Sequence, residues 1–236
     1  MRIIIPTCDK YRNILEANKY SLDKSNGTNL DVTILGYKNP EFDMCNWKFV
    51  SLGNDTGAQN FTNDLIPYFQ DFNDEYFIYG NDDCIFTNRF NNEFLFEIIE
   101  TIKSIPNFGR MWLTQTPSRF YGGSNIIKVF NNYCIAEINQ SANYRLSLQY
   151  SIWKTSYFKK YLIPNISPWQ WEMRDTAKND GTAILLPINS FVVSVGHVMK
   201  KGKLLSGWNK SIYDDGQLGD EDTEVINQIF KKHNIL

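Results

Sequence analysis

The stretch EYFIYGNDDCIF, residues 75–86, decides the fold class of this chain. Its apolar part is continuous, as in a strand covered on both faces, and it stops at Asn81, Asp82 and Asp83. Adjacent carboxylates on such a turn offer the oxygen ligands that Mg²⁺ or Mn²⁺ binds, often together with substrate phosphates. Asn and Asp also form turns by bonding their own backbone, so the triplet alone leaves a metal site and a plain turn both open.

Strands and helices alternate on the amino-terminal side of this stretch. We predict strands at residues 2–7, 32–35 and 48–53, and helices at residues 11–22 and 61–69. Pro67 is expected to kink or shorten the second helix. Because right-handed crossovers join parallel strands, the pattern predicts an α/β fold with a mainly parallel central sheet. Ligands of such sheets bind beyond the carboxyl ends of the strands, where PTCD of the first strand and the NDD turn both lie.

The second half of the chain is more mixed. Its predicted helices lie at residues 92–104, 156–162, 169–178 and 223–232, and its predicted strands at residues 110–113, 126–130, 134–138, 183–186 and 191–195. The last helix is preceded by Asp220, Glu221 and Asp222, which favour the amino end of a helix and do not indicate a calcium loop. No linker divides the chain, so we expect a single domain over residues 1–236.

Composition limits the class of protein. The 236 residues are 42% hydrophobic and 21% charged with a net charge of −2, and no stretch is rich in Lys or Arg, which argues against nucleic acid or an anionic membrane as a partner. The apolar run before Pro6 holds only three Ile residues, too few for a signal sequence or a membrane span, so we expect a soluble, cytoplasmic protein. The four cysteines are far apart and form no CxxC pair, so their spacing predicts reduced core thiols and no zinc site.

In this context EYFIYGNDDCIF resembles the Asp-x-Asp strand of GT-A-type glycosyltransferases, which use nucleoside-diphosphate sugars as donors. Asn81 stands where the first acid of that motif is usual, and Asp83 stands at the last. The resemblance implies a Mn²⁺ or Mg²⁺ ion held mainly by Asp83, with Asn81 as a neutral ligand and His197 as a further one. His197 can equally be a satisfied, partly buried histidine.

The same resemblance implies which residues contact the donor. The stretch LGNDTGAQNFTNDLIPYF, residues 52–69, is similar to the segment that approaches the sugar nucleotide in these enzymes. The loop after the first strand is expected to hold the base and ribose, with a UDP-sugar as the favoured donor. The residues implied in donor binding are Pro6, Thr7, Asp9, Tyr11, Asn60, Asn81 and Asp82. The loop residues Thr7 and Asp9 can also simply cap the following helix.

A second resemblance covers LSLQYSIWKTSYFKKYLIPNISPWQWE, residues 146–172. It is similar to a group of GT-A-like transferases of bacteria and bacteriophages that share three elements in this order: Leu148-Gln149, Trp153-Lys154, and Ser167-Pro168-Trp169 followed by Glu172. The resemblance implies that Glu172 begins a helix beneath the acceptor and takes the proton of the acceptor hydroxyl, which gives inversion, with Asp175 in reserve. A role for Glu172 in the helix dipole, and a retaining reaction, both stay open.

The resemblance also divides the chain into a donor half, residues 1–115, and an acceptor and catalytic half, residues 116–236. The residues implied in contacts with the acceptor or the sugar are Gln149, Trp169, Gly122 and Gly123, although the two glycines can also form a plain turn. Only one of Trp169 and Trp171 is expected to reach substrate, because alternate helix positions point different ways. The acceptor is expected to be a glycan or another hydroxyl compound.

The two alternative functions are nucleotidyl transfer and non-catalytic binding. Nucleotidyl transfer would require a glycine-rich, basic phosphate loop directly after the first strand, and PTCDKYRN contains no glycine. A non-catalytic glycan- or nucleotide-binding protein on a decayed glycosyltransferase fold stays open because Asn81 replaces an acid.

Overall fold

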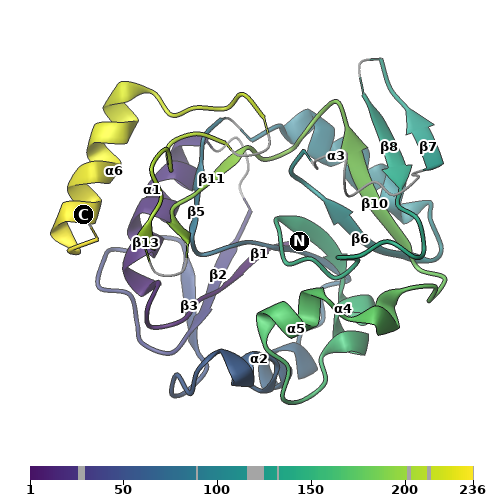
Figure 1. The fold of residues 1–236 in the computed structure, drawn as a ribbon, viewed down its shortest axis with the longest axis horizontal. Helices are drawn as coiled ribbons and strands as arrows, with labels where there is room; N and C mark the ends of the chain where they lie inside the picture. Colours follow the sequence, from purple (N-terminus) through teal and green to yellow (C-terminus); the bar gives the residue numbers. More distant parts are fainter. Residues whose placement is uncertain are drawn as a thin grey trace.

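The computed structural model describes residues 1–25, 30–88, 90–115, 125–131, 133–200, 203–211 and 214–235. Within these ranges nine strands form one central sheet in the order β3-β2-β1-β4-β9-β6-β10-β8-β7 (Figure 1). The strands are β1 (Ile3–Pro6), β2 (Val32–Gly36), β3 (Lys48–Ser51), β4 (Tyr76–Tyr79), β6 (Phe108–Trp112), β7 (Asn125–Val129), β8 (Cys134–Glu137), β9 (Ser151–Lys154) and β10 (Ala183–Ile188).

The sheet is mainly parallel, as predicted. Strands β3, β2, β1 and β4 are parallel neighbours, and β6 is parallel to β10. Strand β9 is antiparallel to both β4 and β6, and β8 is antiparallel to both β10 and β7. Only β8 and β9 therefore run against the other strands of this described sheet. Strand β9 was not predicted, because its residues, SIWK, run directly into the helix Thr155–Tyr161 with no Gly, Pro, Asn or Asp to mark the end of a strand.

Helices cover both faces of the sheet. Their bounds are α1 (Leu15–Ser25), α2 (Phe61–Gln70), α3 (Asn92–Lys103), α4 (Thr155–Tyr161), α5 (Pro168–Glu172) and α6 (Asp220–Lys232). Buried side chains of α1 and α3 pack in one core cluster, and those of α2, α4 and α5 pack in a second cluster on the other face. Helix α6 packs against α1 in a third, smaller cluster. None of the helices in the described ranges is long and apolar enough to cross a bilayer.

Three local predictions were wrong. Of the two effects expected of Pro67, shortening is wrong, because helix α2 continues past this residue to Gln70. The helix predicted at residues 169–178 ends at Glu172, because Arg174 is extended and a separate 3-10 turn, Asp175–Ala177, follows. The strand predicted at residues 191–195 begins only at Val195, since the backbone N–H groups of residues 192 and 193 both donate to the carbonyl oxygen of Leu113.

The strand that begins at Val195 is β11 (Val195–His197), and it pairs with β5 (Cys84–Phe86) in a separate antiparallel ribbon. A second short ribbon follows it, formed by β12 (Met199–Lys200) and β13 (Lys203–Leu204). The first ribbon follows β4 in the chain and contacts α1 through β5. Met199 and Leu204 of the second ribbon pack against the small cluster that contains Ala17 of α1, and Figure 1 shows β11 and β13 near this helix.

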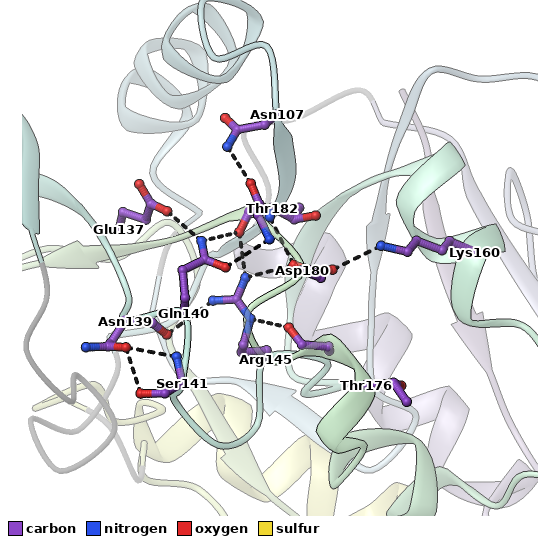
Figure 2. Close-up of polar contacts among 12 residues, drawn as sticks. Asn107, Glu137, Asn139, Gln140, Ser141, Arg145, Lys160, Thr176, Asp180 and Thr182 are labelled. Atoms are coloured by element: carbon purple, nitrogen blue, oxygen red, sulfur yellow. Dashed lines mark hydrogen bonds and ion pairs between the residues drawn. The ribbon is translucent and has the colours of Figure 1, made fainter.

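A buried arginine holds the chain together between α5 and β10. Arg145 is 1% exposed and donates to the carbonyl oxygens of Ala177 (2.6 Å), Thr182 (2.5 Å) and Asn139 (3.2 Å). It also contacts the Asp180 carboxylate at 3.4 Å (Figure 2). Because it joins backbone groups of three segments, Arg145 fixes the turn that follows α5.

Candidate functional site

The predicted donor loop and the NDD turn emerge side by side. Strands β1 and β4 are parallel neighbours with Ile4 opposite Tyr79, and the Gly80 N–H donates to the carbonyl oxygen of Ile4 at 2.8 Å. The loop that starts at Thr7 and the turn at residues 81–83 therefore leave the same edge of the sheet. This edge is the carboxyl end of both strands, as the sequence predicts.

Asp82 faces the donor loop. Its carboxylate receives hydrogen bonds from the Thr7 side chain and from the backbone of Cys8, which lower its pKa. Burial is the largest effect and the charge of Asp83 is the second; both raise the pKa of Asp82 and together bring it to about 7. Asp82 is thus half-buried between the two predicted donor segments.

Asp83, Cys84 and His197 form a cluster of potential metal ligands, which we call the Asp-Cys-His cluster. Strand β11 places His197 directly opposite Cys84 of β5. Asp83 Oδ2 lies 3.6 Å from His197 Nδ1, and the Cys84 sulfur lies 3.9 Å from both His197 Nδ1 and Asp83 Oδ1. Burial, with the charges of Asp83 and Asp82, keeps the pKa of the Cys84 thiol well above its usual range.

The chemistry of this cluster fits a divalent cation. One carboxylate, one imidazole and one sulfur have ligand atoms within 4.8 Å of one another. The nearby Asn81 Oδ1 is a buried oxygen with no hydrogen-bond partner, while the Asn81 carbonyl oxygen accepts from Asn18 Nδ2 at 3.1 Å. Asp83 and His197 are therefore brought together as predicted, and Cys84 is a neighbour that the sequence reasoning missed.

The other predicted donor residues have contacts elsewhere in the fold or within their own loop. Asp9 Oδ2 is paired with Lys38 at 2.9 Å, while Asp9 Oδ1 is buried without a hydrogen-bond partner. Tyr11 packs against the small cluster beneath α6. The Asn60 side chain donates to Thr56 Oγ1 at 2.9 Å, so its described contacts are local. Pro6 is the last residue of β1.

Glu172 is the last residue of α5 and is half-buried. Its Oε1 accepts the backbone N–H of Leu148 at 2.7 Å, which ties α5 to the segment that leads into β9. The reserve base Asp175 lies apart from this contact: its side chain is 84% exposed and pairs with Lys178 at 2.7 Å. Glu172 thus ends a helix, whereas the sequence predicted that it begins one.

The negative charges of Asp82, Glu172 and Asp83 all affect the pKa of the Tyr79 hydroxyl. Burial is the main cause that raises the pKa of Tyr79 well above its usual range, and these three carboxylates add to it in that order. Tyr79 is the last residue of β4, directly before Gly80 and the NDD turn. The charges of the NDD turn and of Glu172 therefore both act on the residue that ends β4.

The two tryptophans of α5 differ as expected. Trp171 is completely buried in the core, whereas Trp169 is 66% exposed. Gln149 Oε1 is buried without a hydrogen-bond partner. The residue before it, Leu148, donates its backbone N–H to Glu172. Gly122 and Gly123 lie outside the described residues.

Arg110 of β6 is a second residue that sequence reasoning missed. It is fully buried, its guanidinium lies 3.8 Å from the centre of the Trp112 ring, and it donates to Ser151 Oγ at 2.6 Å. Ser151 in turn donates to the Gln149 carbonyl oxygen at 2.6 Å. Burial lowers the pKa of Arg110 to about 9, and the charge of Glu172 opposes this. A charged residue inside the apolar strand stretch FGRMW was the available signal.

Two surface hollows of about 310 and 380 Å³ lie elsewhere. Both include Asp74, and they open beside the amino ends of β1 and β4, lined in part by Arg2 and Tyr76. They are at the edge of the sheet opposite to the carboxyl ends, so they take no part in the candidate site.

Comparison with known proteins identifies the fold. No protein-family model and no curated protein sequence matches the chain. The structure of Staphylococcus aureus TarS residues 1–349 is similar, with a TM-score of 0.53 and 13% identity over 82% of this chain and 59% of that one. The same segment in complex with UDP gives a TM-score of 0.53, 12% identity and the same coverage. The segment in complex with UDP-GlcNAc gives a TM-score of 0.50 and 11% identity over 82% of this chain and 57% of that one.

The chain spans about three-fifths of that TarS segment and 36% of the longer TarS chain. Identities this low are informative about the fold and not about the reaction. The mainly parallel α/β sheet predicted from the sequence is confirmed, and the structural neighbours of the chain have folds of the GT-A type.

Proposed function

We propose that this protein is a glycosyltransferase that moves a sugar from a nucleoside-diphosphate sugar to an acceptor hydroxyl. One observation carries the proposal: Asp83 and His197 meet at the carboxyl end of β4, beside the donor loop of β1. The GT-A-type fold supports it, since ligands of parallel α/β sheets bind at this edge.

The donor is proposed to bind between the loop after β1 and the NDD turn. Pro6, Thr7, Asp9 and Tyr11 would hold the base and ribose, and Asn60, Asn81 and Asp82 the remainder of the nucleotide. A UDP-sugar is favoured, because the similar TarS segment was crystallised with UDP and with UDP-GlcNAc. Asp83, His197 and Asn81 would hold a divalent cation, Mn²⁺ or Mg²⁺, which supplies positive charge for the diphosphate leaving group.

Glu172 is proposed as the general base. Its Oε1 is held by the Leu148 N–H, so the carboxylate is fixed while Oε2 is left for the acceptor. The acceptor oxygen attacks the anomeric carbon, its proton passes to Glu172, and the bond from that carbon to the diphosphate oxygen breaks, with inversion. Exposed Trp169, three residues before Glu172, and Gln149 are proposed to contact the acceptor or the transferred sugar. The acceptor class is a glycan or another hydroxyl compound.

A panel of nucleotide sugars tests this proposal. Release of nucleoside diphosphate is measured with added Mn²⁺ or Mg²⁺ and after chelation, for the wild type, for Glu172→Gln and for the control Glu224→Gln on the exposed face of α6. We expect turnover of one donor that is lost on chelation and in Glu172→Gln and kept in the control. Donor binding measured by calorimetry without any turnover would instead support a non-catalytic nucleotide-binding protein. No binding of any donor would overturn the glycosyltransferase function.

A further inference from the structure

The sulfur of Cys84 occupies a defined place in the Asp-Cys-His cluster. The side chain is completely buried, so the thiol is closed to bulk water. Its hydrogen-bond-range polar neighbours are Asp83 Oδ1 at 3.9 Å and the ring nitrogens Nδ1 and Nε2 of His197 at 3.9 and 4.0 Å. The two other side chains of the cluster are thus the polar groups that the sulfur contacts.

Strand pairing fixes these three residues. Val195, Gly196 and His197 of β11 lie opposite Phe86, Ile85 and Cys84 of β5. The Val198 N–H donates to the Asp83 carbonyl oxygen at 2.7 Å, which continues the pairing past His197. Gly196 is closely covered on its other side, because an added Cβ would lie 2.6 Å or less from the carbonyl oxygens of Trp208 and Lys210. The imidazole is therefore held in register with the thiol and does not reach it through a mobile loop.

The spacing of the ligand atoms favours one coordination geometry. Bond lengths of roughly 2.0–2.3 Å at tetrahedral angles separate sulfur, nitrogen and oxygen ligands by roughly 3.4–3.6 Å. Octahedral Mg²⁺, with bonds of roughly 2.0–2.1 Å, brings neighbouring ligands to roughly 2.9 Å. His197 Nδ1 lies 3.6 Å from Asp83 Oδ2 and 3.9 Å from the Cys84 sulfur, and the ligand atoms of all three residues lie within 4.8 Å of one another. The two distances from His197 Nδ1 are closer to the tetrahedral values than to the octahedral ones. The donor atoms agree, since sulfur and imidazole suit borderline or soft ions better than Mg²⁺.

We propose that Cys84 is a direct ligand of the cation, together with Asp83 and His197, and that the site prefers Zn²⁺ or Co²⁺ to Mg²⁺. Three protein ligands leave a position open for an oxygen of the donor, as in zinc sites that bind substrate. This inference rests on the proposed glycosyltransferase function for the role of the ion. Binding of the ion itself is measurable without donor, acceptor or turnover.

Co²⁺ titration tests the sulfur ligand directly. A thiolate bound to Co²⁺ gives a charge-transfer absorption in the near ultraviolet that nitrogen and oxygen ligands do not give. We expect this absorption in the wild type, in Cys45→Ser and in Cys134→Ser, and its loss in Cys84→Ser, with folding of each variant checked by circular dichroism. Because Cys84 is buried and its replacement can impair folding, a variant that keeps Cys84 as the only cysteine is the reciprocal test, and it should retain the absorption.

Calorimetry of Zn²⁺ and Mg²⁺ binding gives the second readout. Many sites prefer Zn²⁺ to Mg²⁺, so the informative quantity is the change of that preference on mutation. We expect Cys84→Ser to weaken Zn²⁺ binding about tenfold or more and Mg²⁺ binding less than about threefold. A Co²⁺ complex of the wild type without the sulfur absorption, or equal losses for both ions, would overturn the inference.

The two proposals fail differently. If the sulfur absorption is present but no nucleoside diphosphate binds to the metal-loaded protein, the metal ligand is right and the glycosyltransferase function is wrong. If a nucleotide sugar is turned over with Mg²⁺ and the sulfur absorption is absent, the function is right and Cys84 is not a ligand.

Discussion

Glu172 Oε1 accepts the backbone N–H of Leu148 at 2.7 Å, and this contact joins α5 to the segment that enters β9. Because β9 is the neighbour of β4 in the sheet, the contact relates the proposed base to the strand that ends at the NDD turn. The residue is therefore both a structural acceptor and a candidate base, and the two roles can be separated by mutation.

Glu172→Gln and Glu172→Ala should separate these roles. Gln keeps an oxygen for the Leu148 N–H but cannot take a proton, so we expect turnover to fall by about 10²–10⁴-fold with little change in thermal stability. Ala loses turnover and also leaves the N–H unpaired, which should lower the free energy of unfolding by about 1–3 kcal/mol. Kinetics and urea unfolding of both variants measure this. Full turnover in Glu172→Gln would remove the residue from the mechanism.

Trp169→Ala should affect acceptor binding and not stability, whereas Trp171→Ala should lower stability. Trp171 is fully buried, so its removal is expected to lower the free energy of unfolding by about 3–5 kcal/mol. Trp169 is 66% exposed, so its removal should leave stability nearly unchanged and raise KM for the acceptor. Thermal melts and acceptor titrations of the two variants check the expectation. An unchanged KM in a stable Trp169→Ala protein would exclude the proposed contact.

Two buried arginines offer a matched comparison. Arg145 satisfies three backbone carbonyls, whereas Arg110 donates to Ser151 and leaves Nε and Nη1 without hydrogen-bond partners. Arg145→Met should therefore destabilise the fold by about 3–5 kcal/mol, while Arg110→Met should change stability by no more than about 1 kcal/mol, since a poorly paired buried charge contributes little. Urea unfolding measures both. Equal losses would show that the Arg110 guanidinium is satisfied in solution.

Asp180 should make stability depend on acid pH. Burial acts to raise its pKa, but hydrogen bonds from Tyr161, the Thr182 N–H and Lys160 together lower it below the usual value. A carboxyl whose folded-state pKa is depressed contributes stability above its unfolded pKa of about 3.9, and that contribution is lost as pH falls through the folded pKa.

Asp180→Asn is consequently expected to destabilise the protein more at pH 7 than at pH 3, because at pH 3 the unfolded wild type already gains stability by protonating this carboxyl, whose unfolded pKa is about 3.9. Urea unfolding of both proteins at the two pH values tests the sign. A difference that is independent of pH would mean that the pKa of Asp180 is not depressed in the folded protein.

Gly196→Ala should disturb the pairing that holds His197. The new Cβ would meet the carbonyl oxygens of Trp208 and Lys210, which are backbone atoms and cannot rotate away. We expect a stability loss of about 1–3 kcal/mol and weaker metal binding. Gly219→Ala is the control, because that position has no atom within 4 Å of an added Cβ and lies in an extended conformation before α6. Wild-type metal binding by Gly196→Ala would show that the cluster does not depend on this packing.

Sequence patterns predicted the elements with a clear period and missed those without one. The strand of residues 76–79 and the helix Asn92–Lys103 were predicted closely, because a continuous apolar run and a repeating apolar face are visible along the chain itself. Strand β5 was missed because it has only three residues, and β9 was missed because it runs into α4 without a turn residue between them. Both are defined by pairing with their partner strands. The position of Glu172 at a helix end was missed because backbone contacts of Arg145 shape the turn beyond it.

The sequence by itself determined the α/β class, the mainly parallel sheet and the placement of Asp83 at the end of a buried strand, since local periodicity and turn chemistry govern these features. It predicted no metal role for Cys84, because spacing along the chain carries no CxxC signal. Only the tertiary structure brings Cys84 beside His197, which is 113 residues away, by pairing β5 with β11. Cross-strand register decides such contacts, and register is a property of two segments together that neither segment shows alone.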